Sequence, residues 1–397
     1  MRDQKATGSY IDLIRAGEPF RLLFPLGVLI GIGGVLMWPL FVWHFTSTYP
    51  GVEHPRVMIE GFLTCFIVGF LGTALPRLLD VPRFTLGETF AFAAALLAVA
   101  VCHWCGRLLW GDPLFFCTLV AFIFALIGRA FARKDTPPPA FVLVAMGLLS
   151  GLAGSAIQAF AENTPDLLNA SLVQTGRLLL NQGYLLLPIM GIGAFLLPRF
   201  FGLPTRQSFP ESLALPPGWK PRARFAFLCG LAVVASFVME AVGQSRWGCA
   251  LRAATILLYF FREVPFHRAG LGGGPLALGL RISLLAIPTG FILIAIWPDR
   301  ISSFLHVVFI SGFSLLAFIV ASRVILGHSG QSDKFRAPLK SLFLLIALVV
   351  FAMLTRVTAD WMPAICLTHY AYAALLWILG VLIWSIAILP AVRLPDP

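Results

Sequence analysis

Charged residues are the scarcest class in this 397-residue sequence. Only 12% of the residues are Asp, Glu, Lys or Arg, whereas about 25% is usual in soluble domains. Apolar residues make up 59% of the chain, and its mean hydropathy is +0.89. So few charges cannot cover a water-exposed surface. The composition therefore excludes a soluble globular protein and indicates a membrane protein.

The sequence also lacks the marks of other protein classes. Its net charge is +11, but the basic residues are spread over short loops, so we expect no nucleic-acid partner. Residues 1–21 have no early apolar core, which argues against a cleavable signal peptide. The seven cysteines lie mostly within apolar runs, which argues against a disulfide framework. Because there is no nucleophile–base set, nucleotide-binding loop or soluble domain, a self-contained enzyme is not favoured, although catalysis at a metal centre stays open.

Apolar runs long enough to cross a bilayer recur along the whole chain. We expect twelve spans, of which the eighth is the least secure because it is short and contains Arg252. They lie near residues 22–45, 57–79, 86–106, 113–132, 139–161, 177–200, 223–243, 247–261, 274–297, 301–325, 338–355 and 369–390. The sequence thus predicts an all-α, polytopic transmembrane helical bundle over residues 22–393, with tails at 1–21 and 394–397.

The Lys and Arg residues predict the orientation of this bundle. With twelve spans, twenty-one of them fall on the side of the two termini and six on the opposite side. Basic residues concentrate in the cytoplasmic loops of membrane proteins. We therefore expect both termini to lie in the cytoplasm.

A weak repeat relates three of the expected spans. Each carries a polar residue 17 positions before an arginine near the cytoplasmic end. The pairs are Glu60 with Arg77, Gln182 with Arg199, and His306 with Arg323. The regular period favours three four-helix units about one axis, with the polar positions facing a common centre. The alternative is a chance recurrence of a common helix ending.

The histidines gather at the outer side of the expected bundle. Five of the seven lie at or near the outer ends of spans, namely His44, His54, His103, His306 and His369. Imidazole is a common ligand of haem iron and of copper, so the pattern fits a set of metal ligands. The alternative is interfacial polar residues without a ligand. His306 and His328 flank one span and lie roughly 33 Å apart, so they cannot bind the same ion.

Two stretches of the sequence carry a family likeness. The first is His-Pro-Arg-Val-Met-Ile-Glu-Gly-Phe at 54–62, followed by Gly-Phe-Leu-Gly-Thr-Ala-Leu-Pro-Arg at 69–77. The second joins His306 and Gly312 to Arg-Val-Ile-Leu-Gly-His-Ser-Gly at 323–330. Both resemble signatures of the NnrS family, which comprises bacterial multi-pass membrane proteins associated with haem, copper and the response to nitric oxide.

The chain departs from the family pattern at two adjacent positions. Arg56 stands where the pattern has a second early histidine, and Val57 stands where it has a glutamate. Glu60 lies about one helical turn further on and is the candidate replacement for the missing ligand.

The resemblance implies a protein of the bacterial inner membrane that binds haem or copper. It implies a role in nitric oxide metabolism or in the nitrosative stress response, with nitric oxide as a gaseous ligand. The implied metal ligands are His54, His306, His328 and Glu60, and the implied cofactor contacts are His306, His328, Arg323 and Arg281. Two alternatives remain: a transporter of small molecules or ions, and a non-catalytic membrane sensor or assembly factor.

Two further features have competing interpretations. Cys102-His103-Trp104-Cys105 has the spacing of a CxxC motif, but Gly106 follows where a c-type haem site has histidine. Core packing explains it, with a disulfide or a copper contact as the alternative. Glu240 and Arg281 lie within expected spans, where an unpaired charge is costly. Either they pair with each other, or Arg281 meets a carboxylate of haem.

Overall fold

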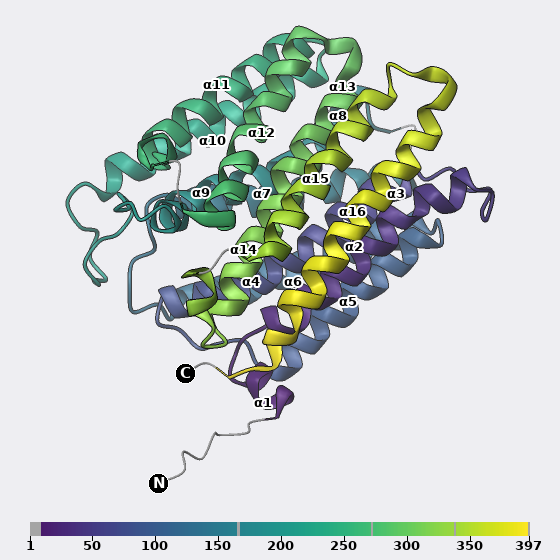
Figure 1. Ribbon diagram of the computed structural model, residues 1–397. Coiled ribbons are helices and arrows are strands. Elements are labelled where there is room, and N and C mark those ends of the chain that lie inside the picture. Colours follow the sequence, from purple (N-terminus) through teal and green to yellow (C-terminus); the bar gives the residue numbers. More distant parts are fainter. Residues whose placement is uncertain (1–8, 165–166, 271–272, 337–338, 396–397) are drawn as a thin grey trace.

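The protein folds as one bundle of long helices. The structure, a computed structural model, describes residues 9–164, 167–270, 273–336 and 339–395. These residues form helices and connecting turns, with no strand among them, which confirms the predicted all-α class. The short helix α1 (Tyr10–Arg15) lies at the end of the bundle where the chain also leaves its last long helix, α16 (Figure 1). We call this the proximal end and the opposite one the distal end.

The long helices follow one another in three groups of four. The first group is α2 (Phe20–Val42), α3–η1–α4 (Glu53–Arg56, Val57–Leu63 and Thr64–Leu78), α5 (Leu86–Trp104) and α6 (Leu108–Phe131). The second is α7 (Phe141–Asn163), α8–η2–α9 (Ala170–Leu178, Leu179–Gly183 and Tyr184–Phe200), α10 (Trp219–Ala241) and α11 (Ser245–Glu263). The third is α12 (Gly274–Ile296), α13–η5–α14 (Ile301–His306, Val307–Ser314 and Leu315–Gly327), α15 (Lys340–Ala359) and α16 (Cys366–Ile388).

The number of membrane spans is close to the expected twelve. Among the described residues, 11 helical segments are long and apolar enough to cross a membrane. The eighth expected span is a helix, α11, but it is not among them, because it carries Arg246, Arg252 and Arg262. Boundaries also differ: α2 begins at Phe20, inside the expected tail, and α8 begins at Ala170, well before the expected start at 177.

The three groups close into a ring. Within each group the first helix packs against the second, and the third packs against the fourth. The last helix of each group contacts the first helix of the next: α6 meets α7, α11 meets α12, and α16 returns to α2. This arrangement is the one expected for three four-helix units about a common axis.

The second helix of each group occupies the centre and is interrupted by a π-helical segment, η1, η2 or η5. These are also the most buried of the 11 spans, with 78%, 78% and 67% of their apolar windows inside the bundle. The three polar positions of the repeat, Glu60, Gln182 and His306, lie within or immediately before these segments. A π-helical turn is wider than an α-helical one and often marks a functional site.

Glycines let the first helices approach the π segments. A Cβ atom on Gly154 of α7 would lie 2.6 Å from the backbone nitrogen of Leu180 in η2. One on Gly290 of α12 would lie 2.9 Å from the carbonyl oxygen of Phe304. Small residues at such crossings are typical of membrane helix packing. They set the positions of the π segments relative to the rest of the bundle.

Candidate functional site

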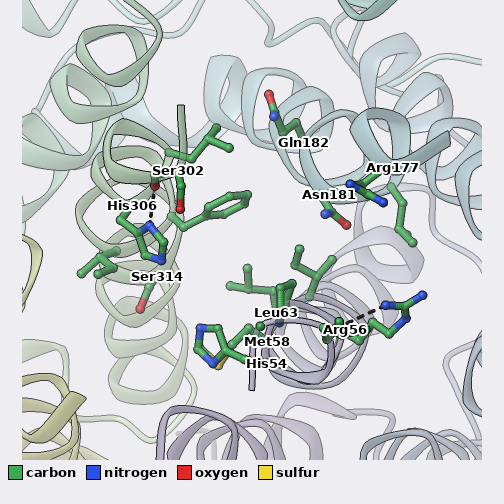
Figure 2. Close-up of a pocket in the computed structure, with 18 of the residues that line it drawn as sticks. His54, Arg56, Met58, Leu63, Arg177, Asn181, Gln182, Ser302, His306 and Ser314 are labelled. Carbon is green, nitrogen blue, oxygen red and sulfur yellow. Dashed lines mark hydrogen bonds between the residues drawn. The ribbon is translucent and has the colours of Figure 1, made fainter. Parts of the chain in front are cut away.

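A cavity of about 680 Å³ lies between the three second helices at the distal end (Figure 2). We call it the distal cavity. Its lining includes Glu60 of η1, Gln182 of η2 and Phe309 of η5, so all three π segments contribute. The volume falls in the range of about 300–1,000 Å³ that is usual for small-molecule and cofactor pockets. The polar residues of the repeat therefore surround a space that can hold a ligand.

His54 and His306 both line the distal cavity, and Figure 2 shows their rings on one side of it. His54 Nδ1 lies 2.9 Å from the carbonyl oxygen of Gly34, and His306 Nδ1 lies 2.6 Å from that of Ser302. A carbonyl oxygen only accepts, so Nδ1 carries the hydrogen and Nε2 keeps its lone pair. Metal-binding histidines are usually held in this way.

The two hydrogen bonds differ in what they imply. The His306 bond reaches back one helical turn, and His369 makes the same kind of bond at 3.1 Å to Ile365 without lining the cavity. The His54 bond instead joins α3 to Gly34 on α2. It fixes the ring against a different helix, and so it orients Nε2 more specifically.

Glu60 lies beside the cavity in a buried cluster. Its Oε2 lies 2.9 Å from His103 Nε2, and that nitrogen lies 3.8 Å from Asp112 Oδ1. Ligand atoms of these three residues all lie within 4.8 Å of one another, so they could hold a metal ion. However, Asp112 already forms an ion pair with Arg56, whose Nε lies 2.9 Å from Asp112 Oδ1. The positive charge of Arg56 disfavours binding of a cation at this cluster. The four residues are better described as a network of ion pairs.

The other two groups have comparable polar clusters behind their central helices. In the second group, the buried Arg252 lies 2.7 Å from Glu240 and donates to Gln182 at 2.5 Å. In the third, Arg356 lies 3.2 Å from Asp360. Tyr370 also donates to Asp360, at 2.6 Å. Each network fixes residues on the cavity wall without placing an unpaired charge in the bundle.

Of the two interpretations of Glu240 and Arg281, the one in which they pair with each other is wrong. Glu240 is near the distal end of α10, whereas Arg281 is near the proximal end of α12. Arg281 donates instead to the carbonyl oxygen of Gly270 and lies 5.2 Å from the ring of Phe201. Helix direction separates the two, and Arg252 of the neighbouring α11 is the partner of Glu240.

Comparison with known protein families identifies the family of this chain. The family model described as NnrS protein matches residues 16–395, nearly the whole chain. The chain belongs to the NnrS family. No curated protein matches its sequence.

In this NnrS family member, the second signature stretch, from His306 to Gly330, extends from one end of the bundle to the other. His328 lies at the proximal end, where its Nδ1 is 3.0 Å from Glu18. Arg77 also pairs with Glu18, and Arg21 lies 2.5 Å from it. Burial alone would raise the pKa of Glu18, but hydrogen bonding to His328 and the charge of Arg21 outweigh it, so the pKa is lowered. His328 therefore belongs to a charged cluster far from the distal cavity, as the sequence predicts.

The remaining predicted residues do not line the distal cavity. Arg323 lies 4.9 Å from the ring of Phe335 and 5.9 Å from that of Phe200. Cys102 and Cys105 are free thiols, so the disulfide interpretation of the CxxC motif is wrong for this structure. Between them, His103 is buried against Glu60.

Sequence reasoning missed part of the site. Asp112, Arg252 and Arg177 were not proposed as site residues, and His103 was noted only as one of the outer histidines and as part of the CxxC motif. The one available signal was the rarity of charges within apolar segments. It identified Glu240 but could not identify its partner, because Arg252 lies on a helix whose packing the sequence does not reveal.

Proposed function

We propose that the distal cavity holds a haem or a copper ion through His54 and His306, and that the protein acts in nitric oxide metabolism or the nitrosative stress response. The observation that carries the proposal is the shared geometry of the two imidazoles. Both have Nδ1 engaged by a carbonyl oxygen, which leaves Nε2 available at the wall of the same cavity. Membership of the NnrS family supports it.

The residues around the two imidazoles fit such a group. Phe62, Phe309 and Trp377 give the cavity apolar surface, and Trp377 Nε1 is itself satisfied by Ser314 at 3.0 Å. These side chains would exclude water from a bound metal, while His54 and His306 bind and orient it. The metal, when bound, supplies a coordination position for a diatomic gas such as nitric oxide.

We also propose that the protein lies in the bacterial inner membrane with both termini in the cytoplasm. The excess of Lys and Arg on the side of the termini supports this orientation. The distal cavity then faces the periplasmic half of the membrane.

The test is an absorption spectrum of the detergent-purified protein, oxidised and dithionite-reduced, with iron and copper quantified in the same sample. We expect a chromophore or a bound metal that is lost in His54→Ala and in His306→Ala. His369→Ala is the matched control, because His369 makes the same backbone hydrogen bond away from the cavity. A metal signal that survives both cavity variants would overturn the assignment.

Transport is a second candidate, which one observation favours. A smaller cavity of about 110 Å³ lies between α4, α9 and α14 and shares Leu63 with the distal cavity. Its lining is almost entirely apolar, so the two cavities together outline a path along the axis of the bundle. Flux of a solute into proteoliposomes, abolished by a large side chain at Ala317 in this lining, would support transport. Metal binding without any flux would favour the first proposal.

A further inference from the structure

One charged residue of the distal cavity has no partner among the residues that the structure describes. The charged lining residues are Arg56, Glu60, Arg177, Glu240 and Arg356. Four of them are paired: Arg56 with Asp112 at 2.9 Å, Glu60 with His103 at 2.9 Å, Glu240 with Arg252 at 2.7 Å and Arg356 with Asp360 at 3.2 Å. Across the described parts of the chain, Arg177 makes no hydrogen bond or ion pair.

Amide groups beside Arg177 add hydrogen-bond donors to the same wall. Gln182 is only 2% exposed, and its Oε1 accepts from Arg252 Nη1 at 2.5 Å. Because that bond fixes the carbonyl side of the amide, the NH₂ group is the part left for a ligand. Asn181 also lines the cavity, and Figure 2 shows it with Arg177 across from His54 and His306.

The distal cavity therefore has two chemically different walls. One presents imidazole Nε2 atoms, which are acceptors or metal ligands, and the opposite one presents a guanidinium and amide NH₂ groups, which only donate. A guanidinium forms paired, charge-assisted hydrogen bonds with planar carboxylates. Arg177 itself is exposed, so its guanidinium is open to an anion that enters from solvent.

We propose that Arg177, together with Asn181 and Gln182, binds the anionic oxygens of the ligand in the distal cavity. The ligand chemistry is a carboxylate or another planar oxyanion. Its source is either a small free anion or the carboxylate of a larger group held by His54 and His306, and only the second source rests on the proposed function. This assigns to Arg177 the contact with a haem carboxylate that the sequence had suggested for Arg281.

The first arm of the test uses formate as the probe and needs no metal. Formate is titrated into the purified protein by calorimetry at constant ionic strength, with chloride as the balancing anion. We expect wild-type binding to weaken by about tenfold or more in Arg177→Gln, because a charged hydrogen-bond partner is lost. Arg177→Lys keeps the positive charge but loses the planar guanidinium with its paired donors, so it should weaken formate binding less than Arg177→Gln.

The second arm compares haem with haem dimethyl ester, in which both carboxylates are esterified. We expect Arg177→Gln to weaken haem binding by about tenfold or more and to leave the ester unchanged, because only haem offers the anionic oxygens. Binding is followed by quenching of tryptophan fluorescence, since Trp38 and Trp377 line the cavity. The matched control for both arms is Arg246→Gln, because Arg246 is an exposed arginine at the start of α11 that does not line the cavity.

The outcomes separate this proposal from the one on which it partly rests. Formate binding that depends on Arg177 supports a free-anion site even if haem does not bind. A loss confined to haem carboxylates supports a larger ligand. If Arg177→Gln changes neither titration relative to Arg246→Gln, then Arg177 only extends toward the membrane surface as interfacial arginines do, and the proposal is wrong.

Discussion

Arg252 and Glu240 form a fully enclosed ion pair, with Arg252 Nη2 2.7 Å from Glu240 Oε2. The side chains are 0% and 4% exposed. Arg252 also donates to Gln182 on the wall of the distal cavity, and its Nε donates to Ser236 Oγ at 3.0 Å. The residues that stabilise the second helical group therefore also fix the position of Gln182 in the proposed site.

Removing one member of this pair should destabilise the protein strongly. Arg252→Leu leaves Glu240 buried without its partner, and we expect a loss of about 3–5 kcal/mol in the free energy of unfolding. The double variant Arg252→Leu/Glu240→Leu should recover most of that loss, because no unpaired charge remains. Unfolding in detergent would measure both. Equal losses in the single and double variants would show that the loss does not come from an unpaired charge on Glu240.

The charge of Arg56 should limit metal binding by Glu60, His103 and Asp112. In Arg56→His the competing guanidinium is gone and an imidazole stands in its place, so copper bound after equilibration with Cu²⁺ and desalting should exceed the wild-type amount by up to about one equivalent per chain. Copper quantification in wild type, Arg56→His and the control Arg246→His checks this. No gain over the control would mean that the cluster serves only as an ion-pair network.

The proximal cluster should make stability depend on pH. The pKa of Glu18 is lowered below its ordinary value of 4.5, so the ionised carboxylate stabilises the folded state at neutral pH. This contribution is fully present above the unfolded value and is lost as the pH falls through the lower, folded value. Glu18→Gln should therefore be less stable than wild type at pH 7, and the difference should shrink below about pH 4.5.

Thermal unfolding at several pH values would test this expectation. Asp12→Asn is the matched control, since Asp12 forms an exposed ion pair with Arg15 on α1. A difference between wild type and Glu18→Gln that stays constant from pH 7 to about pH 4 would contradict the role of the Glu18 charge.

The approach of α7 to η2 should tolerate no larger side chain. At Gly154 a Cβ would lie 2.6 Å from backbone atoms of both Leu180 and Gly176, and backbone cannot move aside as a flexible side chain can. We expect Gly154→Ala to cost about 1–3 kcal/mol of stability. Gly128→Ala, on α6 with open space around it, is the control and should be neutral or slightly stabilising. Equal stability of the two variants would refute the packing argument.

Much of the architecture was predictable because it rests on local patterns. Apolar length gave the spans, and the recurrence of Glu60, Gln182 and His306 before three arginines indicated the three central helices. The sequence also separated His306 from His328, because helix rise alone places them at opposite ends. These features depend on the spacing of residues along one helix, and that spacing follows directly from the residue numbers.

The rest depends on contacts between distant helices. The π segments were not predicted, because residues such as Val57 and Leu179 look like ordinary apolar helix. The partner of Glu240 was not predicted, because its pairing with Arg252 depends on how α10 packs against α11. The proposed role of Arg177 depends on the pairing of the other four charges in the cavity lining, which only the packing of the helices determines.

The central claim is that His54 and His306 bind the same group in the distal cavity. The most direct measurement is a titration of haem, and separately of Cu²⁺, into wild type, His54→Ala, His306→Ala and the double variant. If one group is held by both imidazoles, each single variant should weaken binding of that group by about tenfold or more, and the double variant should lose little beyond either single one. Binding of both probes that is unchanged in all variants, or losses that simply add, would contradict a shared site.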